Sequence, residues 1–313
     1  MCQPVRTRTR VDVAVVVVTY NSALEIVPLL QALPAALAGV DAHVVVVDNH
    51  STDDTLDRVR RVSLSTSVVA LACNRGYAAG INAGVAAARE HRAVLVINPD
   101  VGLGQGAVPR LLAHLDEPGV GIVAPRIIDA NGDFYPSLRR EPTLLRAAGA
   151  AFVGGRRAGK YEMIGEVITD PARYERPTRA DWATGAIMLI SGACWRSVGP
   201  WDETFFLFSE ETDFALRAKD AGWILRYVPD VAVIHRGGIS TSTAPLPYAL
   251  LARNRVRLYG KRHGRIATAA YRTIVGVHEG LRVVRGGRHH RAALKALISQ
   301  RSELVLQPEH QAS

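Results

Sequence analysis

The chain has 313 residues, of which 48% are hydrophobic and 21% charged, and a formal net charge of +9. This composition excludes a disordered protein, because there is ample apolar material for a core. Cys2, Cys73 and Cys194 lie far apart without a Cys-x-x-Cys pair, which excludes a disulfide framework or zinc knuckle and favours a cytoplasmic location. The positive charge predicts an anionic partner, which is nucleic acid, a phosphorylated substrate or an acidic lipid surface.

No apolar run reaches the roughly 20 residues that a membrane span requires. Arg6, Arg8 and Arg10 precede only a short apolar run, Val13 to Val18, and no small-residue cleavage site follows it. We therefore expect neither a signal peptide nor a membrane span.

The first half of the chain alternates β-branched runs with Ala- and Leu-rich stretches, which is typical of a parallel sheet covered by helices on both faces. Between Asn131 and Thr178 this pattern gives way to Gly, Pro and Arg, which predicts a long functional loop or a partly mobile insert. The predicted elements before it are, in chain order, strand 11–18, helix 23–37, strand 43–47, helix 53–62, strand 67–71, helix 77–90, strand 93–97, helix 107–115 and strand 121–124.

Strands and one strong helix return between Trp182 and Ser240, and after Pro247 the chain becomes helical and basic. We therefore expect a catalytic domain over 1–245, with a nucleotide-binding half at about 11–128 and an acceptor half at about 180–245, followed by a basic helical segment over 246–313.

Between Tyr248 and Arg301 there are 13 Lys or Arg residues and a single acid, Glu279. This segment has an apolar stripe at helical spacing, formed by Ile274, Val277, Leu281 and Val284. Three arginines lie outside the stripe, namely Arg272, Arg282 and Arg285. Such a helix rests on a surface. Two interpretations stay open: peripheral binding to anionic lipid at the inner face of the cell membrane, or packing on the domain with the arginines in solvent.

Polar residues follow four of the predicted strands, where ligands of open parallel sheets bind. They are Thr19, Tyr20 and Asn21, then Asp48, then Asn74 and Arg75, and finally Asn98 and Asp100. Asp48 ends an all-Val strand and is a candidate acceptor for a nucleotide base or ribose, whereas Asp53 is better explained as a helix cap. Gly76, Gly80 and Gly84 do not form the dinucleotide fingerprint and equally fit close packing of a helix on the sheet.

Asp100 is the candidate ligand of a hard divalent cation that neutralises a diphosphate leaving group. Asn98, two residues earlier in an extended segment, is expected to point the same way. His235 ends another short strand, where a lone histidine is either structural or a further metal ligand.

A second acidic cluster, Glu210, Glu211 and Asp213, follows an aromatic run, with Ser209 as a candidate N-cap and Arg217 four residues after Asp213. A carboxylate partly desolvated by Phe206 and Phe208 would have a raised pKa and act as a better general base toward a sugar hydroxyl.

Taken together, these segments resemble the family-2-type glycosyltransferases with a GT-A fold, and most closely their rhamnosyltransferase-like branch. The resemblance runs in the family's order from about Val11 to Ser240. The matching segments are 16–21, 47–53, 74–76 with 80–82, 98–100, 184–186, 198–203, 206–217, and His235 with Gly238 and Ser240.

The resemblance implies an α/β, Rossmann-like, mostly parallel sheet flanked by helices. It implies nucleotide contacts from Thr19, Asp48 and Arg75, and the candidate donor residues in the matching segments also include Tyr20, Asn21, Asn74, Gly80 and Asn98. Asp100 would hold Mn²⁺ or Mg²⁺, with His235 as a possible further ligand, and the acceptor side would use Trp182, Gly185 and Ala186.

Two departures from the family pattern leave roles open. The family's Glu-Asp pair is Glu210-Glu211 here, so Glu211 is the base candidate by position, with Glu210 and Asp213 as alternatives. Its Asp-x-Asp triplet begins with the neutral Asn98, which leaves Asp100 as the firm metal candidate.

The resemblance implies an inverting, metal-dependent transfer of a sugar from a nucleotide diphosphate to an acceptor hydroxyl, in cell-envelope polysaccharide or glycoconjugate assembly. It suggests dTDP-L-rhamnose as donor, with UDP-linked hexoses or galactofuranose close behind, and a lipid-linked or glycan acceptor. Two alternatives are a nucleic-acid-binding protein, which the tail's lack of interleaved aromatics disfavours, and a sugar nucleotidyltransferase, which lacks its glycine-rich loop here.

Overall fold

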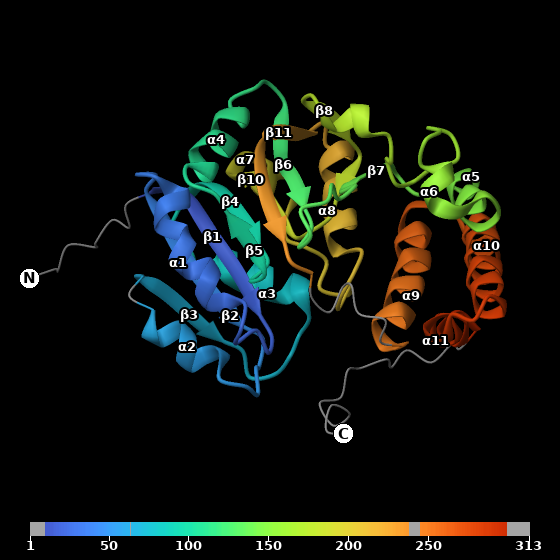
Figure 1. Cartoon of the computed structure of the whole chain (residues 1–313), viewed down its shortest axis with the longest axis horizontal. Coiled ribbons are helices and arrows are strands. Elements are labelled where there is room, and N and C mark those ends of the chain that lie inside the picture. The colour runs from blue at the N-terminus through green and yellow to red at the C-terminus, as the bar shows by residue number, and fades with distance from the viewer. Residues whose placement is uncertain (1–9, 63, 238–244, 299–313) are drawn as a thin grey trace, which may run out of the picture.

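The structure is a computed structural model that describes residues 10–62, 64–237 and 245–298. In Figure 1 a twisted sheet with helices on both faces forms one side of the molecule, and a group of helices forms the other. Arg6, Arg8, Gly238, Ser240 and Arg301, on which parts of the sequence interpretation rest, lie outside the described residues. Within the described part, no helix has both the length and the apolar character that a membrane span requires.

The nine-stranded sheet has the order β3-β2-β1-β4-β10-β6-β11-β5, and β8 pairs with β11. Six of the nine strands, β1, β2, β3, β4, β6 and β11, run in one direction. β10 enters the middle of the sheet antiparallel to both β4 and β6, and β5 and β8 are antiparallel to β11, so four of the eight neighbouring pairs are antiparallel. The strands are β1 (Val11–Thr19), β2 (Ala42–Asp48), β3 (Thr66–Ala70), β4 (His91–Ile97), β5 (Val101–Leu103), β6 (Val120–Ile128), β8 (Thr178–Ala180), β10 (Ile187–Ser191) and β11 (Ile224–His235).

The β-branched residues of the central strands are buried on both faces of this sheet because helices cover both. One face packs on α1 (Ile26–Leu37), α2 (Thr55–Arg61) and α4 (Ala107–His114). The other face packs on α3 (Tyr77–Ala87), α7 (Gly192–Val198) and α8 (Glu210–Asp220). The predicted mostly parallel α/β fold is confirmed, and the short strand β5 is the element of the first half that its sequence did not predict.

Two glycines of α3 let this helix lie close to the sheet. A Cβ atom on Gly80 would stand 2.6 Å from the Val18 side chain, and one on Gly84 would stand 2.4 Å from that of Val16. Gly76, just before the helix, has a positive φ of 87°, and a Cβ there would meet the Phe206 carbonyl oxygen at 2.2 Å. Gly80 and Gly84 therefore allow α3 to pack closely on β1, and Gly76 allows close contact with the Phe206 backbone. Gly80 faces the sheet.

The segment between Asn131 and Thr178 is not the loop or mobile insert that its composition predicts. Its middle packs into the core of the C-terminal helices, where Ala147 lies with Val256, Tyr271 and Val275. Its elements are β7 (Leu138–Arg139), which pairs with β9 (Trp182–Ala183), then α5 (Leu144–Ala148), the π-helix η1 (Gly149–Gly154), α6 (Gly155–Ala158) and the 3₁₀ helix η2 (Pro171–Tyr174).

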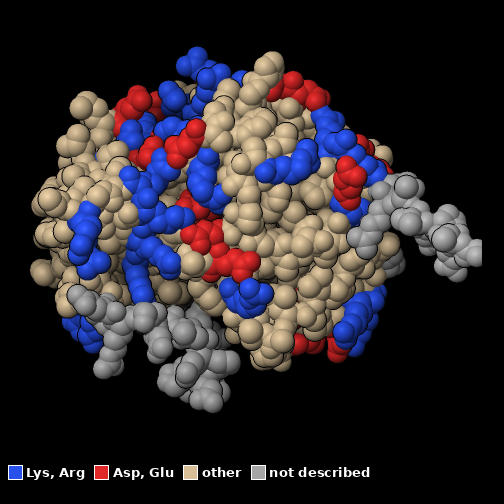
Figure 2. All heavy atoms as spheres, turned by 180° about the vertical axis from the view of Figure 1, so that it is seen from behind, with Lys and Arg blue, Asp and Glu red and all other residues tan. Residues whose placement is uncertain are grey.

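The predicted basic, helical C-terminal segment forms α9 (Pro245–Arg262), α10 (Arg265–Val284) and α11 (Arg288–Ile298). We call these helices, together with α5, η1 and α6, the helical lobe. In Figure 2 a band of basic side chains runs along this lobe beside a patch of acidic ones. At the boundary with the sheet, Lys261 pairs with Asp202 at 2.6 Å and Arg262 with Asp220 at 2.6 Å.

Arg255 of α9 pairs with Glu166, Arg257 donates to the Thr204 carbonyl oxygen, and Arg262 pairs with Glu141, so these arginines are engaged by other parts of the chain. The apolar stripe for which two interpretations stay open lies in α10. On α10 the buried side chains are Tyr271, Val275 and Glu279. Of the predicted apolar stripe, Ile274 packs on the lobe's core, whereas Val277 and Val284 stay 40% and 86% exposed.

Candidate active site

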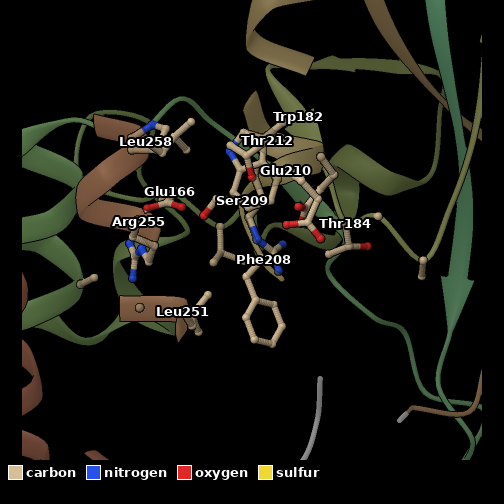
Figure 3. A pocket seen from close by; sticks show the side chains of 18 of the residues that line it. Glu166, Trp182, Thr184, Phe208, Ser209, Glu210, Thr212, Leu251, Arg255 and Leu258 are labelled. Atoms are coloured by element: carbon tan, nitrogen blue, oxygen red, sulfur yellow. Dashed lines mark hydrogen bonds and ion pairs between the residues drawn. The ribbon is translucent and has the colours of Figure 1, made fainter. Parts of the chain in front are cut away.

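A cavity of about 480 Å³ lies where β4 ends, where α8 begins, and where the helical lobe meets the sheet. Figure 3 shows Glu210 and Thr184 at one end, Arg255 beside Glu166 at the other, and Phe208 and Ser209 between them. The predicted site residues that line it are Asn98, Trp182, Gly185, Ala186, Glu210, Glu211 and His235. Residues distant in the chain thus meet at one place.

The two glutamates follow a turn in an unfavourable backbone conformation. Phe208 and Ser209 have φ values of 70° and 76°, a region that costs non-glycine residues on the order of 1–2 kcal/mol each. Buried Asn254 of α9 donates to the Leu207 carbonyl at 2.8 Å and to the Phe208 carbonyl at 3.3 Å. The C-terminal helix therefore holds the turn that aims Glu210 and Glu211 at the cavity.

Glu210 is buried and Glu211 half-buried, and each has one carboxylate oxygen, Oε2, that is buried without a hydrogen-bond partner among the described residues. Burial raises the pKa of both side chains, and the neighbouring Glu211 raises that of Glu210 further. Backbone N–H groups at the start of α8 and the Arg139 guanidinium lower the pKa of Glu211 in part. The sequence predicts a raised carboxylate pKa, and burial of the two glutamate side chains is its main cause. Phe208, one of the two aromatic residues expected to desolvate them, is half-buried and lines the cavity.

The acceptor candidates form the wall opposite Glu211. A Cβ atom on Gly185 would stand 3.2 Å from the Glu211 Cβ, so glycine leaves room for that side chain. The Trp182 indole donates to the Arg140 carbonyl at 3.1 Å, and the Arg139 guanidinium lies 5.7 Å from the Trp182 ring centre. An aromatic wall with a nearby cation thus faces the base candidate, which suits a sugar acceptor.

The metal candidates lie beside the same cavity. Asp100 Oδ2 is 3.3 Å from His235 Nε2, and that nitrogen makes no geometrically good hydrogen bond within the described residues despite the short distance. A carboxylate oxygen and an imidazole nitrogen this close, both largely buried, fit as two ligands of one divalent cation whose other positions go to phosphate oxygens and water. No group of three or more His, Cys, Asp or Glu side chains suited to a metal occurs in the described part of the chain.

Tyr77, which the sequence did not single out, stands between the two acidic sites. Its hydroxyl donates to Asn98 Oδ1 at 2.6 Å. Burial, followed by the charges of Glu210, Glu211 and Asp100, raises its pKa well above the ordinary value. The hydrogen bond from the Tyr77 hydroxyl therefore orients the Asn98 side chain at the cavity that both residues line.

The candidate nucleotide residues lie farther along the same edge of the sheet. Thr19 and Asp48 are register partners at the ends of β1 and β2, and Thr19 Oγ1 donates to Asp48 Oδ1 at 3.1 Å. Asp48 also accepts from the Ser51 amide at 2.9 Å. Its carboxylate therefore orders the loop after β2 even without a ligand.

The loops on either side of Asp48 are tied together by side chains. Asn21, with a φ of 49°, accepts from the Thr52 amide at 2.8 Å, and the Tyr20 amide donates to Ser22. Asn74 accepts from the Gly76 amide, while Arg75 is exposed and pairs with Glu203 at 2.7 Å. Asp53 accepts from the Thr55 amide at 3.1 Å and from the Ala23 amide at 3.2 Å, so it joins the loops before α1 and α2. The N-cap residue of α2 is Asp54, which corrects the predicted cap role of Asp53.

The comparisons with known proteins agree with this geometry. Glycosyl transferase family 2 matches residues 14–187. The chain belongs to this glycosyltransferase family. It is 30% identical over 249 residues to an N-acetylglucosaminyl-diphospho-decaprenol L-rhamnosyltransferase of Mycobacterium tuberculosis, a match covering 74% of this chain and 78% of that protein.

A second relative of this family-2 glycosyltransferase is a dTDP-rhamnosyl transferase of Shigella flexneri, 24% identical and covering 72% of this chain and 70% of that protein. Among solved structures, GalNAc-T7 with UDP, GalNAc and Mn²⁺ superimposes with a TM-score of 0.62 at 13% identity, over 93% of this chain and 56% of that one. This likeness shows the GT-A-like fold. The predicted family resemblance, its rhamnosyltransferase-like branch and glycosyltransferase activity are therefore confirmed.

Two predictions about α8 of the glycosyltransferase need correction or restriction. Ser209 occupies the N-cap position, but its side chain makes no capping hydrogen bond, because its backbone is left-handed. Asp213 pairs with Arg217 at 2.8 Å, as its spacing predicts, and also with Lys261 at 2.5 Å. Since both cations hold its carboxylate, we assign Asp213 a structural role and leave Glu210 and Glu211 as base candidates.

Sequence reasoning missed Arg139, Asn254 and the Arg255–Glu166 pair, which joins α9 to the insert at 2.7 Å. They lie in regions without a motif, and their importance comes from partners distant in the chain. Only Tyr77 could have been found, because it directly follows the matching segment 74–76.

Glu210→Gln should stabilise the metal-free protein increasingly as pH rises. A carboxyl with a raised folded-state pKa is favourable while protonated and loses that contribution as pH rises through the folded pKa. Thermal unfolding in chelator should show a gain of about 2–4 °C at about pH 8 and less at about pH 5.5.

The matched control is Asp220→Asn, whose effect should have the opposite sign. A hydrogen bond from Arg262 lowers the pKa of Asp220, so its loss costs stability at the higher pH. A pH-independent effect of Glu210→Gln would contradict a desolvated Glu210.

Proposed function

We propose that the protein transfers a hexose, with L-rhamnose from dTDP-L-rhamnose as the first candidate, to a hydroxyl of a lipid-linked or glycan acceptor with inversion at the anomeric carbon. The reaction would serve cell-envelope polysaccharide or glycoconjugate assembly. The observation that carries the proposal is the unpartnered Glu211 carboxylate oxygen in a cavity walled by Trp182 and Gly185. The two rhamnosyltransferase relatives support the choice of donor.

In this proposal Glu211 takes the proton of the acceptor hydroxyl. The oxygen forms a bond to the anomeric carbon while the bond from that carbon to the diphosphate oxygen breaks, so a single displacement inverts the centre. Burial suits Glu211 to the task, because a base with a raised pKa binds the proton more strongly. Glu210, one residue before it, keeps the region's negative charge high and is the alternative base.

The donor would lie along the ends of β1, β2 and β3. Thr19, Asp48 and Arg75 would contact the nucleotide, with Tyr20, Asn21 and Asn74 shaping the loops around it. Asp48 has accepting capacity beyond its bonds to Thr19 and Ser51, since a carboxylate offers about four acceptor positions. Gly80 contributes through the close packing of α3.

Asp100 and His235 would hold Mn²⁺ or Mg²⁺. Such a cation supplies positive charge that neutralises the diphosphate. The 3.3 Å separation of their facing atoms and the missing hydrogen bond of His235 support this assignment. The Mn²⁺ in the structure of GalNAc-T7, a protein of similar fold, is consistent with it.

Exposed apolar and basic side chains on the helical lobe support peripheral association with the anionic inner face of the cell membrane. Phe152 of η1 is 70% exposed and Val284 of α10 is 86% exposed, and η1 packs against α10. Arg156, Arg157 and Arg285 are exposed beside them. Apolar side chains flanked by arginines are the pattern of interfacial helices, at roughly 1 kcal/mol for each basic residue near the lipid.

Glu211→Gln should lower transfer about 10²- to 10⁴-fold, because the isosteric amide cannot accept the proton. The affinity for the nucleotide sugar should not change. Turnover with several nucleotide sugars, and binding by calorimetry, would measure the two effects. Glu211→Asp, which restores an acid of shorter reach, should recover part of the rate, and near wild-type turnover of Glu211→Gln would remove Glu211 as the base.

Asp100→Ala should weaken the binding of Mn²⁺ in the presence of dTDP by about tenfold or more, because one of two protein ligands is lost. Electron paramagnetic resonance of Mn²⁺ would measure binding, and transfer in chelator would measure dependence. Asp202→Ala, which removes an acid that pairs with Lys261, is the control. Full wild-type activity in chelator would contradict the metal site.

The double change Phe152→Glu with Val284→Glu should abolish most flotation of the protein with vesicles of anionic lipid. It replaces two apolar side chains that would enter the lipid and adds negative charge that the lipid repels. Leu24→Glu is the matched control, since Leu24 is 76% exposed just before α1, and α1 and α10 lie on opposite sides of the molecule in Figure 1. Equal flotation of both variants would place the membrane contact elsewhere.

A further inference from the structure

The cavity reaches well beyond the base candidates into the helical lobe. Its inner end holds Tyr77, Asn98 and His235. Its outer end is lined by Ala150 and Gly155 of the insert and by His278 and Arg282 of α10. Its volume of about 480 Å³ falls in the range of small-molecule sites and leaves room for more than one sugar ring.

The two ends of this cavity carry opposite charge. The inner end has the buried carboxylates of Glu210 and Glu211 with the Asp100 carboxylate nearby. At the outer end Arg255 is neutralised by Glu166 at 2.7 Å, but no carboxylate of the described residues pairs with Arg282. The outer end therefore offers a cation that is free to bind an anion.

His278 lies in the same positive surroundings. Burial lowers its pKa, and the charges of Arg255 and Arg282 lower it further, while Glu279 acts in the opposite direction. His278 of α10 lines the cavity together with Ala150 of η1. An anion placed here would relieve the repulsion that His278 experiences from the two arginines.

The cavity wall between the two ends is largely apolar, with Ile164, Leu207, Phe208, Leu251 and Leu258. Close to the outer end lie the exposed apolar side chains of η1 and α10 that we propose to contact lipid, among them Val153 and Leu281. A ligand held here would thus have its anion next to Arg282 and an apolar tail next to the proposed membrane surface.

We propose that the outer end of the cavity is an acceptor subsite for the diphosphate of a lipid-diphosphate-linked sugar, with Arg282 and His278 contacting its phosphate oxygens. This inference rests on the proposed function, because it places the acceptor sugar at Glu211. The inner carboxylates repel a second phosphate group, so the acceptor's diphosphate is held away from the donor's. Arg282 then selects acceptors whose negatively charged diphosphate lies as far from the reacting hydroxyl as the outer end of the cavity lies from Glu211.

Calorimetric titration with farnesyl diphosphate, below its aggregation concentration, tests the subsite without any transfer. Arg282→Ala should weaken this binding at least about tenfold, the equivalent of about 1.4 kcal/mol, and His278→Gln should weaken it less. Arg272→Ala is the matched control, because Arg272 is an exposed arginine of α10 that does not line the cavity. The affinity for dTDP should stay unchanged in all three variants.

Farnesol and farnesyl monophosphate serve as the ligand controls, and both should bind more weakly than the diphosphate. Equal losses in Arg282→Ala and Arg272→Ala would overturn the subsite, as would a loss of dTDP binding in Arg282→Ala or equal binding of farnesol. If Glu211→Gln keeps full transfer while Arg282→Ala still loses farnesyl diphosphate, the base assignment fails and the subsite stands. If Glu211→Gln loses transfer while Arg282→Ala binds normally, only the subsite fails.

Discussion

Two adjacent glutamates, each with a buried carboxylate oxygen that finds no hydrogen-bond partner within the described residues, are the constraint on which the rest of this structure depends. Glu210 and Glu211 lose hydration on folding, which raises the pKa of both and costs stability, and the charge of Glu211 raises the pKa of Glu210 further. The start of α8 offsets part of this cost, because backbone N–H groups there face the carboxylates. The remaining cost is tolerated because a base with a raised pKa suits the removal of a hydroxyl proton.

The strained turn before α8 explains why the helical lobe belongs to the catalytic unit. Phe208 and Ser209 hold left-handed conformations, and Asn254 of α9 binds the carbonyls of Leu207 and Phe208. Lys261, from the same helix, bridges Asp202 and Asp213 on either side of that turn. Lys261 of α9 therefore serves the packing of the site, whereas no carboxylate of the described residues pairs with Arg282 of α10.

A separation of charges organises the whole molecule from donor to acceptor. Nucleotide candidates line the ends of β1 to β3, Asp100 and His235 stand at the middle, and the cations of α10 lie at the far end of the cavity. Two anionic substrates can occupy one cleft only if their phosphates are kept apart and separately neutralised. In the proposed arrangement Asp100 and His235 would hold the cation that neutralises one of them, and Arg282 would bind the other.

The sequence alone determined the alternation of strands and helices, the polar residues at strand ends, the acids behind the aromatic run and the resemblance to family 2, because each is written in neighbouring residues. It could not show that residues 131–178 fold onto the C-terminal helices, since Ala147 and Tyr271 become core only through each other. Nor could it show that Asp213 is paired on both sides while Glu211 is not. Asp213 pairs with Lys261 as well as with Arg217, and Lys261 lies far along the chain. Only the tertiary structure decided which acids stay unpaired and where the cavity ends, because charge and burial at a site are set by contacts between distant segments.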